Sequence, residues 1–86
     1  MALVSISPVP ASVAWDHRGS SPTVVRFGER ALRVRRLRTV RDERAAYPAG
    51  GVPRLTLVVE VDSGEALELV FDARRRRWFV DALDAA

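Results

Sequence analysis

The sequence predicts a mostly β protein: a small antiparallel sheet or partly open barrel of five to six strands, built from a hairpin and a three-stranded meander. Three observations support this prediction. Short stretches alternate apolar and polar residues, which is the pattern of strands with one buried face. Sequences rich in glycine, proline and aspartate separate these stretches, as turns do. The chain of 86 residues has room for one domain, over residues 1–86.

The meander is predicted by the alternation in residues 54–84. Leucine and valine occupy every second position in residues 55–61, and the same spacing returns in residues 67–71. Between them, the segment 62–65 contains Gly64, which can adopt the positive φ of a tight turn. A second break at residues 72–75 precedes the apolar run 78–80. We therefore expect three antiparallel strands joined by short turns.

A hairpin is predicted before the meander. Residues 23–27 are typical of a strand, and Gly28-Glu29-Arg30 is typical of a three-residue hairpin loop. The strand that follows places Leu32 and Val34 inward. The hairpin therefore supplies two strands of the predicted sheet.

The alternation in the second hairpin strand slips at Arg36, which occupies a position where an apolar residue is expected. A β-bulge at Arg35-Arg36 would restore the register, because two residues would then oppose one. A helix is the alternative, since Val34, Leu37 and Val40 are spaced by three. The β-branched valines and the incoming hairpin favour the strand.

The remaining segments give weaker signals. Residues 1–12 are either a loosely ordered arm or part of an edge strand, where nearby prolines are tolerated. Residues 42–53 are expected to be a long connection, because two prolines and a Gly-Gly pair interrupt any helix or central strand. A helical turn over residues 41–46 is the alternative there. Residues 79–86 either prolong the third meander strand or form a terminal helical turn.

All fourteen basic residues are arginine, and they are unevenly distributed. Residues 18–44 hold nine arginines against three acids, a local net charge of +6. From Arg54 onward there are five arginines against seven acids, a net charge of −2, and Asp16 brings the total to +3. A GC-rich genome explains the choice of arginine over lysine but not this clustering. The asymmetry points to nucleic acid or an acidic protein surface as a partner.

Two groups of residues are candidates for nucleic-acid binding. The first is a basic strip on the solvent face of the hairpin, where strands place guanidinium groups within reach of neighbouring phosphates. The second is a run of arginines beside an aromatic ring, as in proteins that bind single strands. The alternative for the second group is a solvated turn whose arginines pair with nearby acids while the tryptophan packs in the core. The candidates are Arg26, Arg33, Arg35 and Arg38 in the strip, and Arg74, Arg75, Arg76 and Trp78 in the turn.

The pattern contains none of the residue sets that catalysis or metal binding usually needs. There is no cysteine, and His17 is the only histidine. Glycine-rich phosphate loops, nucleophile elbows and zinc motifs are absent from the sequence. The acids Glu60 and Glu68 are expected to pair with arginines across strands rather than to bind a metal. We therefore expect a binding module without enzymatic activity, cofactor or metal.

A protein–protein or homodimerisation module is the alternative function. If Phe79 lies on the same face as Val58 and Val70, the meander has a second apolar patch that another segment or a second copy would cover. No apolar run approaches the length of a membrane span, and Pro8 and Pro10 interrupt the start too early for a signal peptide. We expect a soluble cytoplasmic protein with no membrane partner.

A family resemblance extends over residues 13–84. Phe27, Arg30 and Leu32-Arg33-Val34-Arg35, followed after an insert by Arg77-Trp78-Phe79 and Leu83-Asp84, resemble a group of short uncharacterised β-domains frequent in actinobacteria. That group carries a Trp-Arg-Gly-Arg-x-Tyr-Arg-Val segment before a variable loop and a closing Gly-Arg-Trp-x-Leu segment. Phe27 stands for the tryptophan and Leu32 for the tyrosine, and the aromatic cluster before the loop is absent. The resemblance implies the β fold and, since some members lie near DNA-repair polymerase genes, a link to nucleic acid.

Overall fold

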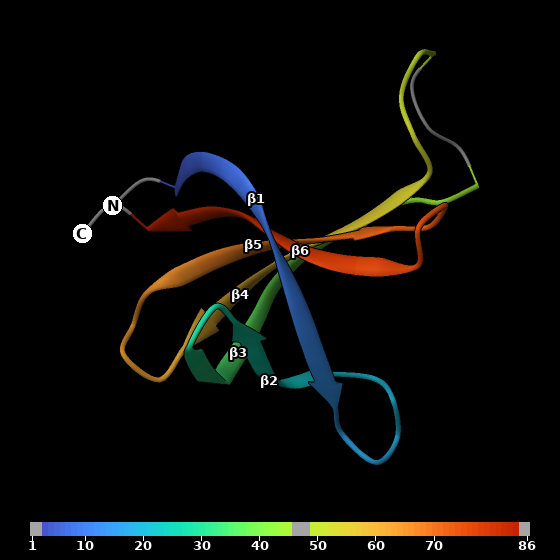
Figure 1. The fold of residues 1–86 in the computed structure, drawn as a ribbon. Helices are drawn as coiled ribbons and strands as arrows, with labels where there is room; N and C mark the ends of the chain where they lie inside the picture. The colour runs from blue at the N-terminus through green and yellow to red at the C-terminus, as the bar shows by residue number, and fades with distance from the viewer. Residues whose placement is uncertain (1–2, 46–48, 85–86) are drawn as a thin grey trace.

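Six strands close into a small antiparallel barrel (Figure 1). The computed structural model describes residues 3–45 and 49–84, and this part of the chain contains no helix. The strands are β1 (Leu3–Trp15), β2 (Pro22–Phe27), β3 (Arg30–Glu43), β4 (Arg54–Val61), β5 (Ala66–Asp72) and β6 (Arg77–Asp84). Each strand pairs with the next, and β6 pairs with β1. The predicted fold class is confirmed, with the sheet closed rather than open.

The meander β4–β5–β6 has the predicted strands and turns. Its inward positions are the most buried of the described chain, because alternate residues of each strand face the barrel interior. The largest fully buried side chains of the meander are Val59, Val61, Leu67, Leu69 and Val80, and β2 adds Val25. Residues 81–84 continue β6, so the strand alternative for the C-terminal segment holds over the described residues.

The β2–β3 hairpin is present, with a loop one residue shorter than predicted. Arg30 pairs with Phe27, which leaves only Gly28 and Glu29 in the loop. Gly28 has φ 56°, as a two-residue hairpin turn requires at its first loop position. The segment after this loop is the strand β3 and not the helix that the sequence left as an alternative.

β3 contains the predicted bulge and a second one. Val34 pairs with Val61 and Arg36 with Glu60, so Arg35 is the extra residue of the first bulge. Leu37 pairs with Val59 and the next pair joins Thr39 to Val58, so Arg38 is the extra residue of the second. Two bulges explain why the apolar residues of β3 are spaced by three instead of two.

β1 is one continuous strand that closes the barrel. Residues 3–12, for which the sequence allowed a loosely ordered arm, lie in this strand, and residues 3–5 and 9–11 pair with β6. Pro8 lies in the irregular stretch between Ser5 and Val9, and Pro10 precedes Ala11, where pairing with β2 begins. Both prolines therefore occupy places where the strand has at most one neighbour, which is where proline is tolerated.

The connection between β3 and β4 covers residues 44–53, of which 46–48 lie outside the described residues. β3 extends through Glu43, so residues 41–43 are strand and not the start of the alternative helical turn. Ala46, the last residue of that alternative, and the terminal residues 85–86 are also outside the described part. No helix long and apolar enough to cross a membrane occurs within residues 3–45 and 49–84.

Candidate functional site

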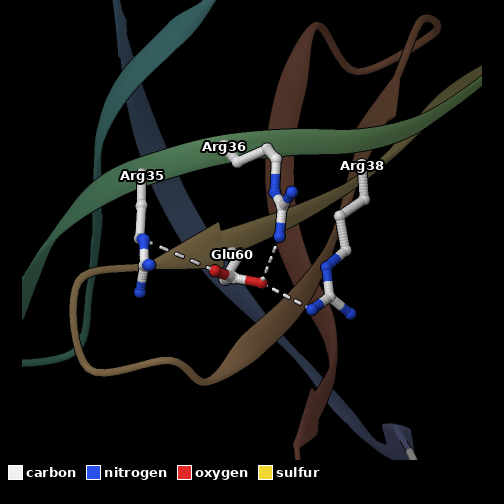
Figure 2. A network of polar contacts seen from close by, with 4 residues as sticks. All are labelled: Arg35, Arg36, Arg38 and Glu60. Atoms are coloured by element: carbon white, nitrogen blue, oxygen red, sulfur yellow. Dashed lines mark hydrogen bonds and ion pairs between the residues drawn. The ribbon is translucent and has the colours of Figure 1, made fainter.

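The two bulges of β3 gather three arginines on one outer face of the barrel (Figure 2). In a regular strand, consecutive side chains point to opposite faces, so Arg35 and Arg36 would be separated. Each bulge adds one residue and resets the alternation. As a result Arg35, Arg36 and Arg38 all project outward, and all three are exposed.

Glu60 of β4 lies at the centre of these arginines, with only 7% of its side chain exposed. Its Oε1 accepts from a terminal nitrogen of Arg38 at 2.5 Å and of Arg36 at 3.3 Å. Its Oε2 lies 3.6 Å from Nε of Arg35. The predicted cross-strand pairing with arginines is thus confirmed for Glu60, whereas Glu68 forms no ion pair among the described residues. A buried carboxylate needs such partners, because its desolvation would otherwise be too costly.

The charges of this cluster do not cancel. Three guanidinium groups surround one carboxylate, which leaves a net charge of +2. The hydrogen bond from Arg38, with a smaller contribution from Arg36, holds the pKa of Glu60 below its ordinary 4.5. Glu60 is therefore ionised at neutral pH and fixes one side of each guanidinium group. The remaining N–H groups stay available to an external anion.

Two further arginines extend the cluster along the outer face. Arg26 pairs with Ala31, and Arg33 pairs with Val24, so the two arginines are diagonal neighbours on adjacent strands. Both are exposed, and neither forms an ion pair within the described residues. We call the five residues Arg26, Arg33, Arg35, Arg36 and Arg38 the arginine strip.

Arg36 is the member of the arginine strip that the sequence candidates did not include. Alternation placed its side chain inward, and only the bulge turns it outward. The spacing of three between Val34, Leu37 and Val40 was the available signal, since two bulges produce it as well as a helix does.

The second predicted group lies at the other end of the sheet. Arg74, Arg75 and Arg76 form the β5–β6 turn, which follows Asp72, the partner of Arg54. Glu60 and Arg54 are separated by six residues of β4, a length of about 20 Å. The strip and this turn are therefore two separate surfaces.

Asp72 organises the β5–β6 turn. Its Oδ1 accepts from the backbone N–H of Arg74 at 2.9 Å and of Arg75 at 3.1 Å. Its Oδ2 lies 3.8 Å from Nε of Arg75. Arg76 adopts the left-handed conformation, with φ 55°. Arg75 is thus paired with an acid, as the alternative in the sequence analysis expects, while Arg74 and Arg76 form no ion pair among the described residues.

Trp78 is half-buried and packs at the margin of the core. Its ring centroid lies 5.2 Å from that of Phe71 and 5.8 Å from that of Trp15, both in tilted arrangements. The ring faces the barrel interior with Phe71 and Leu69 rather than the arginines of the turn. The aromatic ring that shares a groove with an arginine of the turn, Arg75, is Phe79 and not Trp78.

The outer face of the meander carries a groove. Val70 and Phe79 lie in it, as predicted for the second apolar face, while Val58 lines a different hollow. Pro8 and Val52 add apolar contacts. The charged residues of the groove are of both signs: Arg54, Arg75, Asp72 and Asp81.

No group of three or more histidine, cysteine or acidic residues is arranged for a metal ion within residues 3–45 and 49–84. His17 is exposed in the loop between β1 and β2. The sequence matches no family model, and neither the curated proteins nor the solved structures include a significant match to it.

Proposed function

We propose that the protein binds nucleic acid through the phosphate groups, using the arginine strip. The observation that carries the proposal is the convergence of Arg35, Arg36 and Arg38 around the single buried Glu60. With Arg26 and Arg33, the strip holds five positive charges against one negative charge. Guanidinium groups donate two parallel hydrogen bonds to phosphate oxygens, so this density of arginine suits a polyanion.

The composition of the strip favours contacts to the backbone of the nucleic acid over contacts to its bases. Its five side chains are all arginine, and Trp78 packs at the core margin. Base stacking on aromatic rings, which supports recognition of single strands, is therefore not supplied by the strip. We expect binding that depends strongly on salt and weakly on sequence. The resemblance to β-domains near DNA-repair polymerase genes, and a cytoplasmic location, remain predictions in keeping with this proposal.

A pair of double variants tests which arginines bind. Arg33→Ala/Arg35→Ala removes two charges from the strip, and Arg74→Ala/Arg76→Ala removes two from the β5–β6 turn. We expect the first to weaken binding of a fluorescent DNA duplex at least about tenfold at low salt, because two phosphate contacts are lost. The second is the control with the same net charge, and it should retain most of the affinity. Equal losses in both variants would contradict the assignment to the strip.

A homodimer is the second candidate, and the groove beside Phe79 favours it. Its apolar floor and its balanced charges let a two-fold related copy place Arg54 and Arg75 against the acids of its partner. Phe79→Ser should then lower the mass measured by light scattering at high protein concentration. The Arg33→Ala/Arg35→Ala variant should leave that mass unchanged. A monomeric wild-type protein across the same concentrations would exclude this candidate.

A further inference from the structure

A hollow of about 380 Å³ adjoins the arginine strip on the surface of the barrel. Arg38 belongs to both, because it bonds to Glu60 and also lines the hollow. Glu60 pairs with Ala66 of β5, so the lining of the hollow continues directly from the cluster across the sheet. At its far side, Asp84 of β6 pairs with Leu3 of β1. The lining residues are Leu3, Arg38, Val58, Gly64, Ala66 and Asp84.

Asp84 is the residue of this hollow whose hydrogen bonding is incomplete. Its Oδ1 is buried and has no hydrogen-bond partner, the only side-chain atom in this state in the part of the chain that the structure describes. Its carboxylate also forms no ion pair within residues 3–45 and 49–84. Buried polar atoms are nearly always hydrogen-bonded, because an unmade bond is costly. The carboxylate therefore lacks a donor that a ligand in the hollow can supply.

The two charges of the hollow restrict the chemistry of that ligand. The side chain of Arg38 is 47% exposed and keeps N–H groups that Glu60 does not use. Arg38 would repel a metal cation, and Asp84 would repel a simple anion. A ligand that carries both a hydrogen-bond donor and an anionic group suits both residues. Leu3 and Val58 add apolar surface, against which a flat ring can pack.

We propose that the hollow binds one unpaired guanine base of a single-stranded nucleic acid, whose phosphate group contacts Arg38. This inference rests on the proposed function, because the arginine strip supplies the affinity for the backbone. Guanine presents two adjacent N–H donors, at N1 and N2, and the carboxylate of Asp84 can accept from both. Adenine and cytosine place a ring acceptor beside their amino group, and this acceptor would face the second carboxylate oxygen. The contact uses the pairing edge of the base, so a duplex cannot make it.

Three fluorescent single strands test the proposal. One is a short strand of thymidines, and the other two carry a central guanine or a central hypoxanthine, which lacks the N2 amino group. Wild-type protein should bind the guanine strand roughly tenfold more tightly than the all-thymine strand, as a bidentate contact to one base requires. The hypoxanthine strand should lose most of this preference. Annealing each strand to its complement should remove the preference, because the base is then paired.

Asp84→Asn should abolish the guanine preference, because the amide turns a donor toward one of the two guanine N–H groups. It should not lower the free energy of unfolding, since the buried oxygen that it replaces has no partner to lose. Asp81→Asn makes the same charge change in the groove beside Phe79 and should keep the preference.

Two results would overturn this inference and leave the proposed function intact. One is a guanine preference that persists in Asp84→Asn. The other is wild-type protein that binds all three single strands equally well. Absence of binding to every strand, single or annealed, would overturn the inference together with the proposed function.

Discussion

At the scale of single residues, Glu60 accounts for the order of the candidate site. A carboxylate with 7% of its side chain exposed persists in a charged state only with strong partners, and three arginines supply them. The arginines in turn lose side-chain freedom when they are held by Glu60. The same contacts therefore stabilise the fold and orient the groups that we propose bind phosphate.

The lowered pKa of Glu60 predicts a dependence of stability on pH. Because the pKa of the folded state lies below that of the unfolded state, the stabilisation is fully present above about 4.5 and is lost as pH falls through the folded-state value. Glu60→Gln should be less stable than wild type at pH 7, and this difference should shrink as the pH falls below 4.5. Urea unfolding of both proteins from pH 7 to pH 3 measures it. A difference that does not change with pH would contradict the role of Glu60.

At the scale of elements, turns and bulges decide which residues face outward. The β4–β5 turn fixes the register of its hairpin: the N–H of Gly64 donates to the carbonyl of Val61, and the N–H of Val61 donates to that of Glu65, both at 2.9 Å. This register pairs Glu60 with Ala66 of β5, while the pairing of β3 with β4 places Glu60 opposite Arg36. The turn and the two β3 bulges together position the cluster.

Gly64 is the residue of this turn that another amino acid replaces least well. Its φ is 91°, a conformation that residues with a Cβ rarely adopt, although nothing lies within 4 Å of an added Cβ. Gly64→Ala should therefore lower the free energy of unfolding by about 1 kcal/mol through backbone strain alone. Gly51, which is not among the glycines with positive φ, provides the control. Equal losses of unfolding free energy in Gly64→Ala and Gly51→Ala, measured by urea unfolding, would show that alanine is not strained in the turn.

At the scale of the whole molecule, the sequence predicted the individual strands better than the closure of the sheet into a barrel. The alternation in residues 55–71 indicated β4 and β5 directly, because each has one face in the core. Barrel closure depends on the pairing of β1 with β6, two strands at opposite ends of the chain, and β1 is irregular between Ser5 and Val9. Arg36 was missed for a similar reason, since its outward direction depends on a register set by β4. Local patterns do not encode such distant pairings.

If β1 closes the barrel, removing its N-terminal part should destabilise the fold. Removal of a loosely ordered arm would not. Removing residues 1–8 deletes Ile6, which packs against the core, and the pairs that Leu3, Val4 and Ser5 make with β6. We expect the truncated chain to lose about 3 kcal/mol or more of unfolding free energy, or to fail to fold. Thermal and urea unfolding of both chains measure this loss. Unchanged stability of the truncated chain would show that β1 does not close the barrel in solution.

The central claim is that the arginine strip binds the phosphate backbone of nucleic acid, and salt dependence of binding tests it most directly. The affinity of the wild-type protein for single- and double-stranded DNA and RNA should be measured at about 50 mM and 200 mM salt. We predict micromolar or tighter binding at the lower concentration and a steep loss at the higher one, as release of counterions from several phosphates requires. Absence of binding at the lower salt concentration, where the net charge of +3 acts most strongly, would contradict the claim.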